Sequence, residues 1–178
     1  SSCVSRRADH LVPDLVERAR AGEVRAVARL ISLVEDESPA LREGMAALAP
    51  HTGHAQVVGI TGSPGVGKST STNALVGALR ATGKRVGVLA VDPSSPFSGG
   101  ALLGDRIRMN SLDGDRVFFR SLATRGAPEL PDHLPHVIDV AKAAGFDLVI
   151  VETPGIGQGD AAIVPFVDTA MYVMTPEF

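Results

Sequence analysis

The stretch that decides the fold reads Gly62-Ser63-Pro64-Gly65-Val66-Gly67-Lys68-Ser69. It matches G-x-x-x-x-G-K-[ST], a phosphate-binding loop that requires a strand before it and a helix after it. Residues 56–61 have strand character, and residues 69–79 carry apolar side chains at helical spacing. A glycine-rich turn with a surface lysine would explain the glycines, but not Lys68 followed by Ser69. The stretch therefore predicts a site for the phosphates of a nucleotide.

Each residue type in this loop has a physical role. Glycines allow backbone angles that side chains forbid and a close approach to an oxygen-rich ligand. Successive N–H groups form an anion-binding nest, to which the start of the following helix adds partial positive charge. Lys68 can reach the β- and γ-phosphates, and the Ser69 hydroxyl can ligate Mg²⁺. The predicted nucleotide-binding residues of the loop are Gly62, Ser63, Pro64, Gly65, Val66, Gly67, Lys68, Ser69 and Thr70.

Composition excludes several classes of partner. The chain has 178 residues, enough for one α/β domain with a small extension. A net charge of −3, with no Trp and one Tyr, argues against a nucleic-acid partner. No apolar stretch reaches the roughly 18 residues that span a bilayer, so no membrane partner is predicted. Cys3 is the only cysteine, which favours a reducing compartment, the cytoplasm.

The first 53 residues predict a helical extension. One amphipathic stripe runs through residues 11–19 and ends at Gly22, and a second runs through residues 24–34. A third helix is predicted to begin with Ser38 as its N-cap and Pro39 at its first position. The extension either packs on the following domain or binds a partner, and the sequence leaves both readings open. The chain lacks an initial Met and stops just after a strand-like run, so we expect a fragment of a longer protein.

From residue 54 onward strands alternate with helices. The predicted strands are 56–61, 86–91, 117–120, 147–152 and 169–174, and the predicted helices are 68–81, about 101–112 and 132–144. Gly83 is a candidate C-cap. Continuous apolar strands indicate a parallel sheet covered on both faces, with its ligand at the carboxyl ends of the strands. The predicted fold is an α/β P-loop NTPase domain, residues 54–178, with a mostly parallel central sheet flanked by helices and preceded by the extension, residues 1–53.

Acidic residues follow two of the predicted strands. Asp92 and Glu152 stand where carboxylates can hold Mg²⁺ or position water beside a phosphate loop. Asp92 is alternatively a turn residue before proline. Glu152 opens an E-x-x-G sequence where nucleotide triphosphatases usually have D-x-x-G, and Gly155 could then donate its N–H to a γ-phosphate. A strand-to-loop turn is the alternative for this second segment.

Other polar positions give weaker indications. Asp105 is a candidate for a further acid near Mg²⁺, although a solvated helix face explains it equally well. Gln158 is a candidate for orienting a water molecule, and a flexible loop is its alternative. The five histidines have no metal-binding spacing beside acids or cysteines, so no histidine metal site is predicted.

Three stretches together resemble the GTPases associated with methylmalonyl-CoA mutase, the MeaB/ArgK family. They read V-G-I-T-G-S-P-G-V-G-K-S-T, L-A-V-D-P-S-S-P-F-S-G-G-A-L-L-G-D-R-I-R-M and V-E-T-P-G-I-G-Q-G-D. The resemblance covers nearly the whole chain from about residue 11. The later stretches R-S-L-A-T-R and Y-V-M-T-P-E-F look more like the GTPase domain fused inside isobutyryl-CoA mutase, and E-T-P-G-I-G-Q-G-D departs from the E-T-V-G-V-G-Q-S-E usual in stand-alone members. A free chaperone and a domain of a fused mutase therefore both stay open.

The resemblance implies a GTP-hydrolysing chaperone of an adenosylcobalamin-dependent acyl-CoA mutase, acting on methylmalonyl-CoA or isobutyryl-CoA. Such a chaperone gates cofactor loading and protects the mutase, with GTP as substrate, GDP as product and Mg²⁺ as cofactor. A homodimer of the full-length protein is left open. The implied catalytic residues are Lys68, Asp92, Asp105 and Glu152, and the implied metal ligands are Ser69, Asp92, Asp105 and Glu152.

Guanine selection in this class usually rests on an N-K-x-D sequence, and the chain ends before one could occur, so the preference for GTP rests on resemblance. The alternatives are a P-loop kinase or ATPase linked to amino-acid transport, and a non-catalytic nucleotide-binding module that docks a partner.

Overall fold

The computed structural model describes residues 12–39, 41–51, 55–62, 68–92, 117–123, 130–153 and 163–173. These residues belong to two compact units. The first combines Ser1–Ala55 with His133–Phe146, and the second combines Gln56–Asp132 with Asp147–Phe178. The first unit therefore takes a helix from the middle of the sequence, while the predicted division at residues 53 and 54 stays a prediction.

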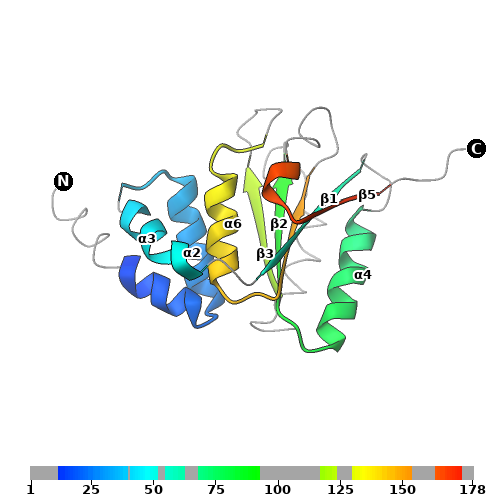
Figure 1. The fold of residues 1–178 in the computed structure, drawn as a ribbon, viewed down its shortest axis with the longest axis horizontal. Coiled ribbons are helices and arrows are strands. Elements are labelled where there is room, and N and C mark those ends of the chain that lie inside the picture. Colours follow the sequence, from blue (N-terminus) through cyan, green and yellow to red (C-terminus); the bar gives the residue numbers. More distant parts are fainter. Residues whose placement is uncertain are drawn as a thin grey trace, which may run out of the picture. The chain divides into compact units, whose positions relative to one another are not determined.

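The first unit is helical throughout its described part. Residues 12–20 form a helix, followed by α2 (Val24–Glu35), α3 (Leu41–Leu48), the short 3₁₀ helix η1 (Ala49–His51) and α6 (Leu134–Ala143) (Figure 1). Both α2 and α3 pack against α6. The apolar stripe predicted for the second helix is the buried face of α2, formed by Ala26, Val27, Leu30, Ile31 and Val34.

The helix over residues 12–20 ends as predicted. Gly22 has a φ of 93°, and its N–H donates to the Ala19 carbonyl at 2.9 Å. The next N–H, that of Glu23, donates to the Arg18 carbonyl at 3.0 Å. This pair of bonds satisfies carbonyls that the last turn of a helix leaves without partners. Glycine suits the position because its φ lies in the left-handed region.

The predicted start of the third helix is wrong by two residues. The end of α2 uses Glu37, at a φ of 52°, and the N–H of Ser38 donates to the Leu33 carbonyl at 3.1 Å. Ser38 therefore completes the end of α2. Its carbonyl accepts the N–H of Leu41 at 3.1 Å, and α3 begins there.

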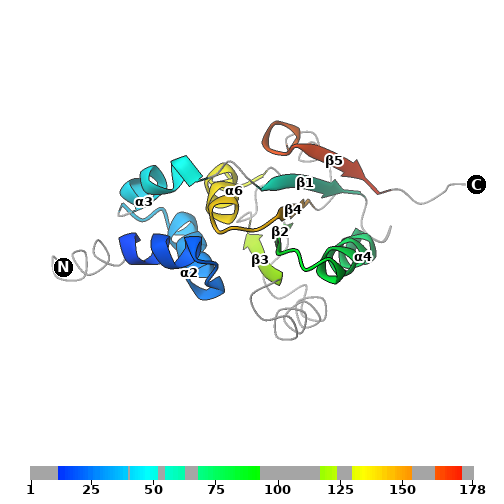
Figure 2. The ribbon, with the colours of Figure 1, turned by 60° about the horizontal axis from the view of Figure 1, so that its bottom comes forward.

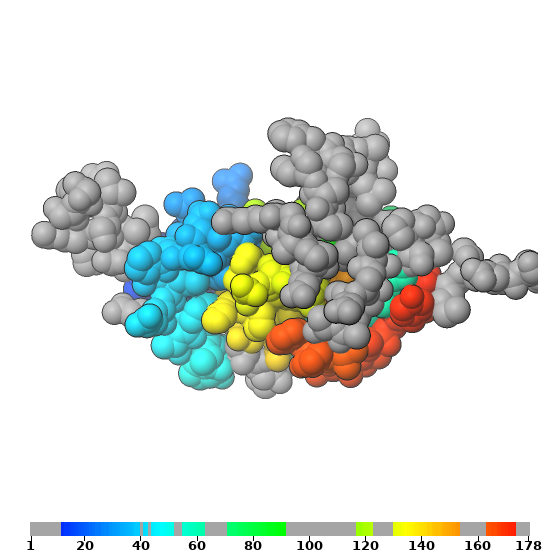
Figure 3. Space-filling view, turned by 90° about the horizontal axis from the view of Figure 1, so that it is seen from above, coloured from blue at the N-terminus to red at the C-terminus, as the bar shows by residue number. Residues whose placement is uncertain are grey.

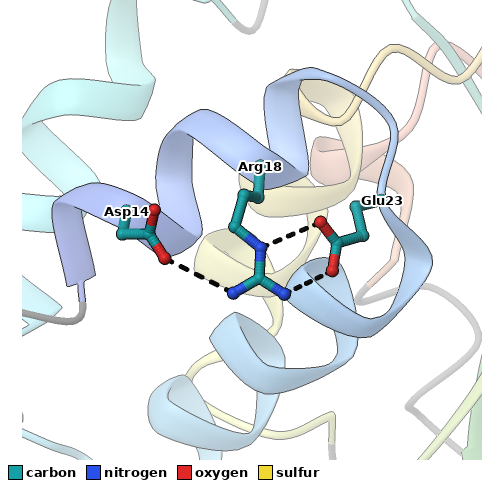
Figure 4. A network of polar contacts seen from close by, with 3 residues as sticks. All are labelled: Asp14, Arg18 and Glu23. Carbon is teal, nitrogen blue, oxygen red and sulfur yellow. Dashed lines mark hydrogen bonds and ion pairs between the residues drawn. The ribbon is translucent and has the colours of Figure 1, made fainter.

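A charged cluster of Asp14, Arg18 and Glu23 stabilises the turn between the first two helices (Figure 4). The guanidinium of Arg18 donates through Nε to Glu23 Oε2 at 2.8 Å and through Nη2 to Oε1 of the same carboxylate. A third contact, at 3.4 Å, joins Nη1 to Asp14. The hydrogen bond from Arg18 lowers the pKa of Glu23, and the hydrogen bonds to Glu23 and Asp14 raise the pKa of Arg18. Bidentate pairs of this kind fix geometry as well as adding attraction.

The second unit contains a five-stranded sheet (Figure 2). Its order is β3-β2-β4-β1-β5, and every pairing is parallel, as predicted. The strands are β1 (Gln56–Thr61), β2 (Val86–Asp92), β3 (Val117–Ala123), β4 (Leu148–Glu152) and β5 (Thr169–Tyr172). The third strand is longer than predicted and the fifth is shorter. The helix predicted near 101–112 lies outside the described residues.

Helix α4 (Lys68–Ala81) packs on one face of this sheet. The contact is an apolar cluster in which Val76, with Leu75 and Leu79 of α4, meets alternate residues of four strands: Val58, Ile60, Val86, Val88, Val117, Leu148 and Ile150. Alternation of side chains along each strand directs these residues to the same face. The predicted C-cap is confirmed, because Gly83 has a φ of 76° and its N–H donates to the Arg80 carbonyl at 2.9 Å.

Two aspartates join neighbouring strands at the amino edge of the sheet. The Asp147 carboxylate accepts the N–H of Arg85 at 2.8 Å, and the Asp147 N–H donates to the Arg85 carbonyl at 2.9 Å. Asp168 makes the same exchange with Val57, at 2.7 and 2.8 Å. Each carboxylate therefore extends the strand ladder by one bond beyond its regular end.

The edge beside β5 presents apolar side chains at the surface. Figure 3 shows the segment from residue 163 to 172, in orange to red, at the exterior of the molecule. Its exposed side chains are Val164, Phe166, Met171 and Tyr172. Within the described ranges, no helix has both the length and the apolar character needed to cross a bilayer.

Candidate nucleotide-binding site

The strand and helix that the phosphate-loop motif requires are both present. Strand β1 ends at Thr61, and α4 begins at Lys68, with the same bounds as predicted. Gly62, the last described residue before the loop, has a φ of 157°, an angle that glycine adopts far more readily than other residues. The first turn of α4 therefore lies beyond the carboxyl end of β1, where a helix N-terminus attracts an anion.

The strand register places Glu152 beside the start of the loop. Glu152 pairs with Ile60 of β1 on one side and with Ala90 of β2 on the other. The N–H of Thr153 donates to the Ile60 carbonyl at 3.0 Å, which continues this pairing one residue further. Because all strands are parallel, the ends of β1, β2 and β4 share one edge of the sheet. Asp92 is the last residue of β2 on that edge.

Glu152 is buried, with 7% of its surface exposed. Side chains alternate along β4, so Glu152 faces the same way as Ile150 and Leu148, toward α4. A buried carboxylate at this edge is a hard oxygen donor of the kind that Mg²⁺ prefers, and it fits a magnesium ion bound through one or two acids and several waters. The described residues contain no group of three or more His, Cys, Asp or Glu side chains that could hold a metal ion. Any fuller ligand set thus has to draw on side chains outside them.

The other predicted site residues are placed only in part. Backbone positions put Lys68, Ser69 and Thr70 in the first turn of α4 and Asp92 at the end of β2, and their side chains lie outside the described part of the chain. Also outside it are Ser63, Pro64, Gly65, Val66, Gly67, Asp105, Gly155 and Gln158. The structure thus brings together Gly62, the start of α4, Asp92 and Glu152 at one edge, and their predicted roles in binding and catalysis stay predictions.

One residue near the site was not predicted from the sequence. Thr72, one turn after Lys68 in α4, is 2% exposed, and its hydroxyl has no hydrogen-bond partner among the described residues. Its spacing of four residues from Val76 places it on the helix stripe that packs on the sheet. That spacing is visible in the sequence, but a threonine at an apolar position of a helix is common enough to give no signal by itself.

Comparison with known proteins gives a consistent result. A family model described as "Methylmalonyl Co-A mutase-associated GTPase MeaB" matches residues 27–178. The fused isobutyryl-CoA mutase of Nocardia farcinica is 59% identical over 167 residues, which are 92% of this chain and 16% of that protein. A protein of Pyrococcus abyssi, provisionally named a GTPase, is 48% identical over 168 residues, 93% of this chain and 52% of its own length.

A solved structure supports the fold. The crystal structure of an LAO/AO transport system kinase superimposes with a TM-score of 0.74 at 29% identity, covering 91% of this chain and 49% of that one. With the parallel sheet and flanking helices, this likeness confirms the predicted α/β P-loop class. The chain spans about half the length of the Pyrococcus relative and 16% of the fused mutase.

Proposed function

Because the chain belongs to the family of methylmalonyl-CoA mutase-associated GTPases of MeaB type, we propose that it binds GTP and hydrolyses it. One observation carries this proposal: the buried Glu152 is held in register between the ends of β1 and β2, at the edge of the sheet where β1 ends and leads on to α4. A phosphate tail bound at the start of α4 would lie next to a carboxylate. Phosphoryl transfer needs this combination of anion cradle and acidic edge.

Different residues supply different parts of the proposed GTP hydrolysis. Main-chain N–H groups of residues 62–70 hold the phosphates, and the Lys68 ammonium offsets the charge that develops on the γ-phosphate. The residues that would hold Mg²⁺ are Ser69, Asp92, Asp105 and Glu152. A bound ion would supply positive charge that offsets part of the charge on the phosphates. The N–H of Gly155 contacts the γ-phosphate and is released after hydrolysis, so the segment after Glu152 changes with the nucleotide.

The wider role that we propose is that of a chaperone. The nucleotide cycle of this chain gates the loading of adenosylcobalamin into an acyl-CoA mutase and protects that mutase. Support comes from the family description and from relatives in which a matching segment is part of a fused isobutyryl-CoA mutase. We place the protein in the cytoplasm, since Cys3 is its only cysteine.

The test compares a substitution of Lys68, at the start of α4, with one of Lys84, just after the end of that helix. Lys68→Ala removes the charge opposite the γ-phosphate and is expected to lower the rate of GTP hydrolysis by about 100-fold or more. Lys84→Ala removes an exposed lysine just after the helix and is the matched control, expected to hydrolyse GTP at the wild-type rate. Release of inorganic phosphate measures both. Hydrolysis by Lys68→Ala at the wild-type rate would refute the site.

A kinase or ATPase is the second candidate, because the solved structure with the same fold is that of a transport system kinase. Calorimetric competition between GTP and ATP, followed by a search for phosphate transfer to a small acceptor, separates the two. Tighter binding of ATP or transfer to the acceptor favours the kinase. Tight nucleotide binding with no turnover favours a docking module without catalysis.

The chaperone role has its own experiment. Apo-mutase is mixed with adenosylcobalamin and this protein, and cofactor uptake is followed by absorbance with GTP or with a non-hydrolysable GTP analogue. We expect uptake to depend on which nucleotide is present. Uptake that is equal with GTP, with the analogue and without nucleotide would contradict gating, whatever the rate of GTP hydrolysis.

A further inference from the structure

The contact between α4 and the sheet is built in layers. Along β4 the residues that face α4 are Leu148, Ile150 and Glu152, two residues or about 6.6 Å apart at each step. Along α4 the residues that face the sheet are Leu79 and Val76. The buried Thr72 lies on the same stripe, four residues before Val76. These residues are three or four apart, so one helical turn of about 5.4 Å is close to one step along the strand. Helix and strand run in opposite directions, so both series move together toward the carboxyl edge.

The buried side chains of the first two layers are apolar, and the third layer adds a buried polar side chain to apolar ones. Leu148 pairs in register with Val86, and Ile150 pairs with Val58 and Val88; all of them belong to the apolar cluster. In the third layer Glu152 pairs with Ile60 and Ala90. Thr72 is the residue of α4 that reaches this level. A buried hydroxyl and a buried carboxylate therefore share the layer directly beneath the start of the phosphate loop.

The Thr72 hydroxyl differs from those of Ser32 and Thr82, which have partners in the backbone. Ser32 donates its hydroxyl to the Ala28 carbonyl four residues earlier, and Thr82 donates to the Leu79 carbonyl at 2.7 Å. Thr72 makes neither kind of bond, although it is almost fully buried. Buried hydroxyls in proteins nearly always have a partner, because leaving one without a partner costs stability. A hydroxyl kept at this cost in the layer of Glu152 points to a role in the site.

We propose that Thr72 is a positioning residue for Glu152: its hydroxyl donates a hydrogen bond to the Glu152 carboxylate when nucleotide occupies the loop. The bond fixes the carboxylate in the orientation in which it faces the magnesium-bearing phosphates. This inference rests on the proposed function and adds a residue to it. Thr72 does not touch the reacting atoms and acts through Glu152 alone.

The experiment uses the full chain and three substitutions. Thr72→Val replaces the hydroxyl with a methyl group of similar size, and Thr72→Ser keeps the hydroxyl. Thr82→Val is the matched control, because it makes the same replacement at an exposed threonine just after the same helix. For each variant the measurements are the thermal midpoint of the nucleotide-free protein, kcat and KM for GTP, and the Mg²⁺ concentration that gives half-maximal turnover.

We expect Thr72→Val to melt at or above the wild-type temperature without nucleotide, since it removes a buried hydroxyl that lacks a partner. Its kcat should fall about 10-fold or more, in keeping with the loss of one hydrogen bond to a charged group, and it should need more Mg²⁺. Thr72→Ser should recover most of the kcat, and Thr82→Val should keep it. When Glu152 is already changed to Gln, Thr72→Val should add little, because the two residues act as one unit.

Two results would overturn the inference. One is a Thr72→Val protein with wild-type kcat and magnesium dependence. The other is a loss of kcat that is equally large in the Glu152→Gln background, which would show that Thr72 acts independently of that carboxylate. Failure of the proposed function looks different, because in that case the wild-type chain does not hydrolyse GTP or Lys68→Ala hydrolyses it normally.

Discussion

Alanine substitutions at two helix glycines, Gly44 and Gly77, separate the cost of a packing contact from the gain in helix propensity. Gly44 lies inside α3, and a methyl group there would come within 2.5 Å of Cγ1 of Val12. Gly77 lies inside α4, and a methyl group there would meet nothing within 4 Å. Changing either glycine to alanine adds the same gain in helix propensity, about 1 kcal/mol. The difference between the two variants therefore reports the contact at Gly44.

The magnitude follows from the stiffness of Val12. Val12 is buried and β-branched, so its side chain cannot turn away from a new methyl group without strain. Overpacking of this kind costs about 1–3 kcal/mol, which cancels or exceeds the propensity gain. We therefore expect Gly44→Ala to be neutral or to destabilise by up to about 2 kcal/mol. Gly77→Ala should stabilise by about 1 kcal/mol.

Urea and thermal unfolding followed by circular dichroism measure both variants. At about 2–4 °C per kcal/mol for a chain of this size, Gly77→Ala should raise the thermal midpoint by a few degrees and Gly44→Ala should not. If unfolding shows two transitions, the stability change of each variant is taken from the transition whose midpoint changes. A Gly44→Ala protein stabilised as much as Gly77→Ala would refute the close packing of α3 on the helix over residues 12–20.

Two further predictions concern charged side chains. The pKa of Glu23 is lowered from its ordinary 4.5 by the hydrogen bond from Arg18, so the pair adds stability above pH 4.5 and loses it as the pH falls through the lowered value. The urea midpoint of Arg18→Gln should thus lie below wild type at pH 7 and approach it at low pH, and a gap that stays constant with pH would contradict this. Asp168→Ala removes the carboxylate that accepts the Val57 N–H and should destabilise by about 1–3 kcal/mol, as measured by urea unfolding, whereas an unchanged midpoint would show that the bond adds nothing.

Local patterns in the sequence predicted the elements around the loop closely. The bounds of β1 and α4 agree with prediction because a strand, a glycine turn and a helix follow one another there without a gap. Gly22 and Gly83 end helices as predicted, since glycine fits the left-handed angle that each turn needs. The predicted start of α3 was two residues early. The end of α2 continues through Glu37, which has a left-handed φ although it is not a glycine, and its residue type gave no sign of this.

The sequence did not predict which segments far apart in the chain contact one another. Nothing in residues 134–143 shows that this helix joins a compact unit with the N-terminal helices, since an apolar stripe fits any apolar neighbour. The closeness of Gly44 to Val12 and the unpartnered hydroxyl of Thr72 also depend on how distant segments meet. For the candidate site, sequence identified Glu152, and the structure added its burial and its register between Ile60 and Ala90.

The two acids at the ends of strand β4 have different surroundings. Asp147 comes directly before the apolar residues 148–151 and Glu152 directly after them, and only Glu152 opens an E-x-x-G sequence. Asp147 stands at the amino end, where its carboxylate completes the ladder by accepting the Arg85 N–H at 2.8 Å. Glu152 stands at the carboxyl end, buried in a layer where a valine would pack without any desolvation cost. The proposed magnesium site gives a reason for a carboxylate at this level of the sheet, which packing alone does not require.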